Sequence, residues 1–169
     1  MSGHAEELGR LRLVFDASPL IALGKIGLLG ALGEMSAACI VPEAVATEVF
    51  AGRDGDPAKE WLQGDPPATV VPVVASLAVA EWGLGAGESA VIAFASEHEG
   101  YAAVLDERAG RTCARAMGVE VRGTLGLLVL AKRMGEISSV RPYVEGLLEA
   151  GYRLAPALIA VVLEEAGER

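Results

Sequence analysis

Short apolar runs alternate with longer segments of helical spacing along the chain, and this alternation predicts its secondary structure. Residues 68–74 look extended, but Pro72 restricts this segment to a sheet edge or to a role outside the sheet. Strands separated by helices indicate an α/β protein with a parallel sheet built from βαβ units. The other strand-like runs occupy residues 12–15, 37–42, 101–106 and 119–123.

Residue types that begin and end helices mark the segments between these strands. Ser18 can cap the first helix, with Pro19 in its first turn, and Thr124 can cap a later one. A glycine-rich loop leads into a helix that runs to Gly100. The expected helices cover residues 18–26, 27–33, 42–51, 56–64, 88–100, 107–117, 124–134, 139–150 and 156–166.

The composition suits a single layered domain. The 169 residues are 52% hydrophobic but only 5% aromatic, so the core must consist mainly of Ala, Leu and Val. No segment reaches the roughly 20 apolar residues of a bilayer-spanning helix, and residues 1–10 lack the order of a signal peptide. We therefore expect a cytoplasmic protein without a membrane partner, in which Cys39 and Cys113 are reduced core residues.

Two predicted strands end on an aspartate, and these residues are the first candidates for a functional site. Asp16 closes the run at 12–15, and Asp106 closes the run at 101–106. Because ligands of open parallel sheets bind outside the carboxyl ends of the strands, both side chains are candidates for one site. Either aspartate taken alone could instead cap the helix that follows it.

Two glutamates extend this hypothesis. Glu48 lies beside the apolar stripe of its helix, and Glu88 opens the helix after the glycine-rich loop, although a helix flank or the helix dipole would explain each charge alone. Converging carboxylates repel, since two unit charges about 4 Å apart cost roughly 4 kcal/mol at an effective dielectric of 20. A divalent cation relieves this repulsion, and Mg²⁺ or Mn²⁺ suits oxygen ligands. The net charge of −9 is compatible with such a cluster, and taken alone it argues against broad nucleic-acid binding.

Other chemistries lack their motifs. His4 and His98 are isolated and no Cys-x-x-Cys occurs, so a zinc site has no support. The loop before Glu88 has neither the Gly-Lys-Ser/Thr ending of a P-loop nor the G-x-S-x-G of a serine hydrolase. A small-molecule phosphatase of the Asp-x-Asp type is weaker too, because Ser18 stands where its second aspartate would be.

The order and spacing of four segments resemble the PIN-domain family. The segments are VFDASPLIALGKIG, VPEAVATEVFAG, GAGESAVIAFA and VLDERAGRTCARAMGVEVRGTLGLLVLAKRMGEI, and the resemblance spans residues 12–165. The chain is similar to VapC-like proteins and to the DUF3368-type branch, which are often encoded beside small antitoxins. The resemblance implies a mostly parallel central sheet flanked by helices, and it implies a metal-dependent ribonuclease.

The resemblance assigns four acids to a catalytic metal site. Asp16, Glu48, Glu88 and Asp106 would hold one or two Mg²⁺ or Mn²⁺ ions for hydrolysis of RNA, which leaves 5′-phosphate and 3′-hydroxyl ends. The wider family pattern is Thr-x-Asp-x-Asp near the last strand.

This chain departs from that pattern. Val104 replaces the threonine, and Arg108 replaces the last aspartate. Glu107 either supplies a compensating carboxylate or caps a helix. These departures keep a second hypothesis open, in which a PIN-like module recognises a partner without cutting RNA.

Several polar residues are candidates for contacts with substrate. Ser18 either contacts a metal-bound water or a phosphate, or serves only as a helix cap. Arg108, Arg111 and Arg115 form an i, i+3, i+7 stripe that serves either surface ion pairs or phosphate contacts. From the resemblance we also expect a homodimer and a small antitoxin that inserts a basic side chain toward the acids. The last helix, at 156–166, either packs on the body or covers a partner surface.

Overall fold

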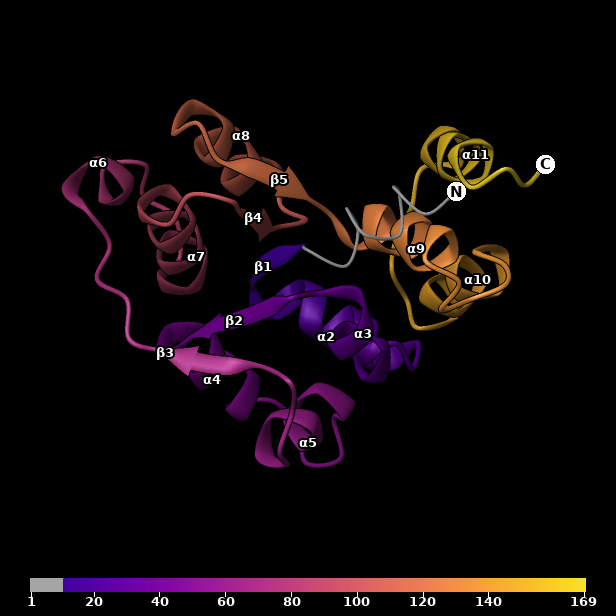
Figure 1. Cartoon of the computed structure of the whole chain (residues 1–169), viewed down its shortest axis with the longest axis horizontal. Helices are drawn as coiled ribbons and strands as arrows, with labels where there is room; N and C mark the ends of the chain where they lie inside the picture. The colour runs from indigo at the N-terminus through magenta and orange to yellow at the C-terminus, as the bar shows by residue number, and fades with distance from the viewer. Residues whose placement is uncertain (1–10) are drawn as a thin grey trace.

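The computed structural model describes residues 11–169, which form a five-stranded sheet with helices on both faces (Figure 1). The strand order is β3-β2-β1-β4-β5, and every neighbouring pair is parallel. The expected α/β class with a parallel sheet is therefore confirmed. The strands are Arg12–Phe15 (β1), Ala38–Pro42 (β2), Thr69–Val71 (β3), Tyr101–Val104 (β4) and Glu120–Arg122 (β5).

Helices connect all of these strands and complete the chain after β5. Because Pro72 directly follows the edge strand β3, the expectation that this segment lies at an edge is confirmed. The helices are Ala17–Lys25 (α2), the 3₁₀ turn Leu29–Ala31 (η1), Leu32–Met35 (α3), Glu43–Phe50 (α4), Pro57–Gln63 (α5), Leu77–Ala80 (α6), Ala86–Glu97 (α7), Arg108–Ala116 (α8), Thr124–Arg133 (α9), Arg141–Glu149 (α10) and Pro156–Glu165 (α11).

Two helical layers enclose the sheet. Helix α7 packs on β1, β2 and β4, with α4 and α8 as its neighbours. Helix α2 contacts α5, α9 and α10, and α11 packs on α9. Figure 1 shows α6, α7 and α8 on one side of the central strands and α2, α9 and α10 on the other. The strand ends are thereby left as the accessible edge of the sheet.

The core is aliphatic, as the composition predicts. Phe15 is the one aromatic residue among the largest fully buried side chains of the described region, and the others are Leu, Ile and Val. Cys39 and Cys113 are both free and buried, so their predicted core role is confirmed. His98 stacks on Phe94 with ring centroids 3.9 Å apart, whereas His4 and the segment 1–10 lie outside the described residues.

Two predicted helix caps are wrong. The first helix starts one residue earlier than expected, and the side chain of Asp16, not that of Ser18, accepts from the backbone of Ala17. Gly123 occupies the N-cap position of α9, and the Thr124 hydroxyl donates to Asp106 instead of accepting from its own helix. Ser18 is the second residue of α2 and Thr124 the first residue of α9, so neither holds the N-cap position from which a hydroxyl accepts from the first free N–H groups.

Other boundaries differ in smaller ways. Helix α7 ends at Glu97, short of the predicted stop at Gly100, and the short helix α6 was not expected. Gly118 and Gly135 do stop α8 and α9, with φ values of 75° and 81° that favour glycine. By length and composition no single helix within residues 11–169 could cross a membrane, although the pair α2 and η1–α3, bent by 110°, passes that test jointly.

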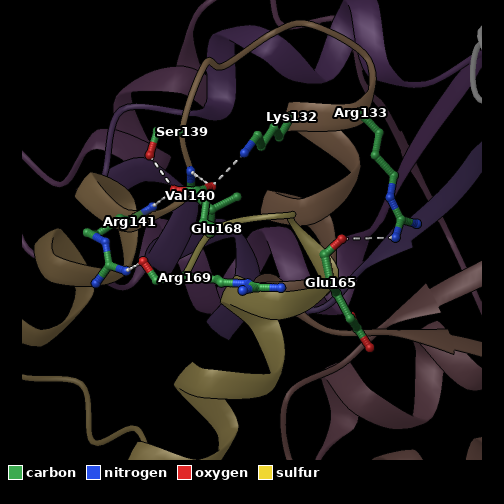
Figure 2. Close-up of polar contacts among 8 residues, drawn as sticks. All are labelled: Lys132, Arg133, Ser139, Val140, Arg141, Glu165, Glu168 and Arg169. Atoms are coloured by element: carbon green, nitrogen blue, oxygen red, sulfur yellow. Dashed lines mark hydrogen bonds and ion pairs between the residues drawn. The ribbon is translucent and has the colours of Figure 1, made fainter.

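One carboxylate fixes the C-terminal region to the body of the protein (Figure 2). The carboxylate of Glu168 accepts hydrogen bonds from the backbone N–H of Val140 (2.7 Å), the Nζ of Lys132 (3.0 Å), the backbone N–H of Arg141 (3.3 Å) and the Ser139 hydroxyl. These five residues are called the Glu168 clasp. The Ser139 and Val140 bonds are the main reasons that the pKa of Glu168 falls to about 2.

Two further bonds from arginines support the clasp. Arg133 donates to the carbonyl of Glu165 at 3.3 Å, and Arg141 donates to the carbonyl of Arg169 at 3.0 Å (Figure 2). Val162 and Leu163 are buried while Leu158 and Val161 are exposed. Of the two roles considered for the last helix, packing on the body is therefore the one found in the described chain.

Candidate active site

Asp16 and Asp106 lie at the carboxyl edge of the sheet, just beyond the ends of the neighbouring strands β1 and β4. Residues Phe15 and Val104 are paired, and the backbone N–H of Asp16 donates to the carbonyl of Val104 at 3.2 Å. Asp106 follows β4 by two residues. The parallel register therefore brings the two aspartates to neighbouring positions at one edge, as the strand-end argument predicts.

The position of Asp106 depends on a residue from the start of α9. Thr124 donates to the Asp106 carboxylate twice, through its backbone N–H at 2.8 Å and through its hydroxyl at 2.6 Å. Thr124 is buried, whereas Asp106 itself is exposed. The aspartate side chain is thus held in one orientation while it remains open to solvent.

Glu48 and Glu88 come from α4 and α7, which pack against each other. The glycine before Glu88 explains how their carboxylates approach Asp16. A Cβ atom at Gly87 would lie 2.5 Å from Glu48 Oε1 and 3.2 Å from Asp16 Oδ1, so both acids face this glycine. A Cβ at Gly110 would collide with Glu88 Oε2 in the same way. Because Gly87 and Gly110 have no side chains, there is room beside them for the carboxylates of Asp16, Glu48 and Glu88.

These acids line a pocket of about 320 Å³. We call it the acidic pocket, and its lining residues are Asp16, Ser18, Glu48, Gly85, Glu88, Glu107 and Ala109. Asp106 lines an adjoining pocket of about 380 Å³, which shares Ser18 and Glu107 with the acidic pocket. Three of the four predicted acids therefore meet in one hollow, and the fourth lies next to it.

The carboxylates of the acidic pocket disturb one another's ionisation. Burial raises the pKa of Asp16 to about 7, against the lowering effect of its bond to Ala17, and the charges of Glu88, Glu48 and Asp106 raise it further. Burial and the charges of Glu107 and Glu48 also raise the pKa of Glu88. None of the salt bridges found within residues 11–169 involves these acids.

The donor set fits a hard divalent cation. Every ionisable side chain that lines the acidic pocket is a carboxylate, and Mg²⁺ and Mn²⁺ prefer oxygen ligands. Glu88 Oε2 is buried and has no hydrogen-bond partner within the described region. As placed, no group of three or more His, Cys, Asp or Glu residues in 11–169 is close enough to hold an ion. The carboxylates that line the pocket would therefore have to move closer together to complete a ligand set.

One departure from the family pattern, Val104, has a structural explanation. Val104 is fully buried in the central strand β4, where an apolar side chain packs well. Glu107 occupies the N-cap position of α8 but makes no capping hydrogen bond, so the cap role considered for its side chain is wrong. Because Glu107 lines the acidic pocket, it is available as the additional carboxylate.

The predicted arginine stripe lies on α8. Arg108 and Arg115 are exposed, and Arg111 donates from Nη1 to the carbonyl of Leu105 at 2.8 Å. None of the three forms an ion pair in the described part of the chain, so the ion-pair alternative for this stripe is not realised. Arg111 also lies near Asp106, because a Cβ on Gly123 would be 3.0 Å from Arg111 Nη1 and 3.1 Å from Asp106 Oδ1.

Comparison with known families agrees with the fold. A family model of the DUF3368 type, described as a PIN domain, matches residues 12–168. The chain therefore belongs to the PIN-domain family. PIN domains are in general nucleases that use divalent metals, so the protein has a nuclease-type fold. No curated protein matches the sequence closely enough to add a named relative.

Proposed function

We propose that this protein is a metal-dependent endoribonuclease and that Asp16, Glu48, Glu88 and Asp106 are its catalytic acids. The observation that carries the proposal is the acidic pocket itself, which gathers the buried Asp16, the partly buried Glu88 and the exposed Glu48 and Glu107 with no basic side chain on its lining. Such an arrangement is unfavourable for an unliganded protein. It becomes favourable when Mg²⁺ or Mn²⁺ enters the pocket, because the cation offsets the repulsion.

When bound, the metal supplies an activated water for in-line attack at phosphorus and offsets charge on the leaving oxygen. The chain's own residues prepare the site for this chemistry. Asp16 is held rigidly at the end of β1 by burial and by its bond to Ala17. Asp106 is oriented by Thr124. Glu48 and Glu88 reach the pocket from packed helices, and Glu107 is an additional donor.

Ser18, Arg108 and Arg111 are the proposed substrate contacts. Ser18 is exposed and lines both the acidic pocket and the pocket beside Asp106, where its hydroxyl can donate to a phosphate oxygen. Arg108 and Arg111 bring positive charge to the edge of an otherwise acidic site. This local positive charge attracts the phosphates of RNA to a protein whose overall net charge of −9 repels them.

The proposal extends to the biological setting. A cytoplasmic toxin, held inactive by a small antitoxin and acting as a homodimer, is consistent with the family to which the chain belongs. The antitoxin would present a basic side chain to the acidic pocket, where the unneutralised carboxylates would favour it.

A cleavage assay tests the activity. Single-stranded RNA is incubated with the protein and Mn²⁺, and wild type is compared with Asp16→Asn and with Asp65→Asn, an exposed aspartate away from the pocket. We expect endonucleolytic products with 5′-phosphates from wild type and Asp65→Asn, and no products from Asp16→Asn. Equal cleavage by all three proteins, or cleavage by none with any divalent metal, would rule out the proposed activity.

A partner-recognition module is the second candidate function. It is favoured by the lack of a preformed ligand set of three acids within residues 11–169 and by Arg108 at the position of the family's last aspartate. This candidate predicts that Mn²⁺ does not bind the acidic pocket and that RNA stays intact. The same assay, combined with a metal titration, separates the two functions.

A further inference from the structure

A second groove lies beside the proposed active site, between α11 and the start of α9. It has a volume of about 460 Å³ and is distinct from the acidic pocket, with which it shares no lining residue. We call it the α11 groove, and it is lined by Asp106, Arg111, Val121, Arg122, Gly123, Leu125, Gly126, Leu158, Val161, Val162 and Glu165. Asp106, one of the proposed catalytic acids, lines this groove, so the groove directly adjoins the proposed active site.

Arg122 gives the groove a positively charged hydrogen-bond donor. Its Nη2 donates to Glu120 at 2.8 Å, and its Nε is buried, with no partner in the described part of the chain. The side chain as a whole is 27% exposed and lines the groove, so a phosphate that enters the groove can contact the charged guanidinium. Arg111 lies on the same lining, with Nη1 bonded to Leu105.

The opposite wall of the groove is apolar and exposed. Leu158 and Val161 of α11 keep 46% and 50% of their surface accessible, although Val162 beside them is buried. The Glu168 clasp, which lies at the far end of α11, holds this wall in place (Figure 2). A ligand for the groove therefore needs an anionic group at one side and a flat apolar surface at the other.

We propose that the α11 groove binds one nucleotide unit of the RNA, with a phosphate at Arg122 and the base against Leu158 and Val161. The inference rests on the proposed function, and it adds a site that holds the RNA chain beside the cleaved bond. The carboxylates of Asp106 and Glu165 on the same lining accept hydrogen bonds from ribose hydroxyls. An arginine that stays ionised at all working pH values and an apolar wall are a sequence-tolerant means of holding a nucleotide.

Binding of a mononucleotide without metal tests the groove separately from catalysis. Adenosine 5′-monophosphate (AMP) is titrated into the ¹⁵N-labelled full chain in EDTA, and the Nε–H resonance of Arg122 is followed by NMR. We expect AMP to shift this resonance and Arg122→Gln to weaken AMP binding about tenfold or more, since a charge-assisted bond is lost. Arg115→Gln is the control, because it removes an exposed arginine near the C-terminal end of α8, outside the groove.

A second pair of variants tests the apolar wall. Val161→Asp places a carboxylate in the groove at an exposed position that tolerates it, and Leu77→Asp makes the same kind of change on α6. We expect Val161→Asp to weaken AMP binding at least fivefold and Leu77→Asp to leave it unchanged. Adenosine and inorganic phosphate should each bind more weakly than AMP, because each supplies only half of the contacts.

The results for the groove and for the proposed function can be told apart. If RNA is not cleaved but AMP binds at Arg122, the nuclease proposal fails and the nucleotide site stands. If RNA is cleaved but AMP leaves the Arg122 resonance unmoved, or if both groove variants bind AMP as wild type does, the inference about the groove is overturned.

Discussion

The acidic pocket and the Glu168 clasp place the same chemical group in opposite surroundings. In the clasp one carboxylate accepts four hydrogen bonds, one of them from a lysine, and its pKa falls to about 2. In the acidic pocket several carboxylates face one another, and the pKa of Asp16 rises to about 7. The first arrangement stabilises the fold, whereas the second costs stability when its carboxylates are ionised.

This difference shows what a cluster of unpaired carboxylates costs the protein. The donors that satisfy Glu168 come from the segment between α9 and α10 and from α9 itself, within the protein. The buried Oε2 of Glu88 has no such donor in the described region. A carboxylate that the fold could have paired, but did not, is a reason to look for a cation. Changes to the acidic pocket should therefore lower activity and raise stability. Changes to the Glu168 clasp should lower stability and leave activity nearly unchanged.

The largest expected effect is that of Asp16→Asn, which should change both RNA cleavage and the free energy of unfolding. Cleavage of RNA should fall about 1,000-fold or more, because removing a group that stabilises the transition state costs this much. In the absence of metal the free energy of unfolding at pH 8 should rise by about 2 kcal/mol, since a buried charge is removed. Urea denaturation monitored by circular dichroism measures the second effect, and a variant that is less stable than wild type would contradict it.

The next effect is the dependence of stability on pH, which should have opposite signs for the two regions. Folded Asp16 keeps its proton up to about pH 7 whereas the unfolded chain releases it near pH 4, so its contribution to stability is lost as pH rises from 4 to 7. Folded Glu168 stays ionised down to about pH 2, so its contribution is present above about pH 4.5 and is lost as pH falls toward 2.

Denaturation curves at a series of pH values check these slopes. Asp16→Asn should flatten the curve between pH 4 and 7, and Glu168→Gln should flatten it below pH 4.5. Addition of Mn²⁺ should raise stability most at pH 7 and above, where the acidic pocket is ionised. If both variants keep the slopes of the wild-type curve, the pH dependence does not come from Asp16 and Glu168, and the account of these two regions is contradicted.

Breaking the clasp should affect stability more than chemistry. Glu168→Gln removes the charge that Lys132 and the Val140 N–H contact, and we expect a loss of about 2 kcal/mol in the free energy of unfolding. Cleavage under conditions where the protein is folded should fall no more than a few-fold. Glu164→Gln, an exposed neighbour on α11, is the matched control and should behave like wild type.

The smallest expected effect comes from filling the space between the acids. In Gly87→Ala the new methyl group meets Glu48 Oε1, the end of a flexible side chain, so the glutamate moves aside. Activity should fall about tenfold, while stability stays within about 1 kcal/mol of wild type because alanine favours a helix. Gly30→Ala, which has open space around it, should not change activity. Full activity in Gly87→Ala would mean that Glu48 has no role.

Much of the fold and part of the site follow from local patterns in the sequence. Strand ends at Asp16 and Asp106 are visible because an apolar run stops on an acid, and parallel pairing then dictates that the two lie together. The glutamates are visible only through the family resemblance, since each is also explained as an ordinary helix charge.

The remaining features depend on tertiary contacts that no local pattern encodes. Thr124 looks like a helix cap, yet it lies 18 residues from the Asp106 that it orients. Gly87 looks like part of a flexible loop, but it is needed for the room that it leaves between acids. Ser139 and Glu168 are 29 residues apart, and only the folded chain shows that they meet. Arg122 falls within the predicted strand at 119–123, but the groove that it lines exists only after α11 has packed.

Crystals soaked in Mn²⁺ and measured with anomalous scattering test the central claim most directly. The account predicts an anomalous peak in the acidic pocket, with oxygen atoms of Asp16 and of at least one of Glu48 and Glu88 about 2.2 Å away, and no peak at the Glu168 clasp. An empty acidic pocket at millimolar Mn²⁺, with the four acids unmoved, would contradict it.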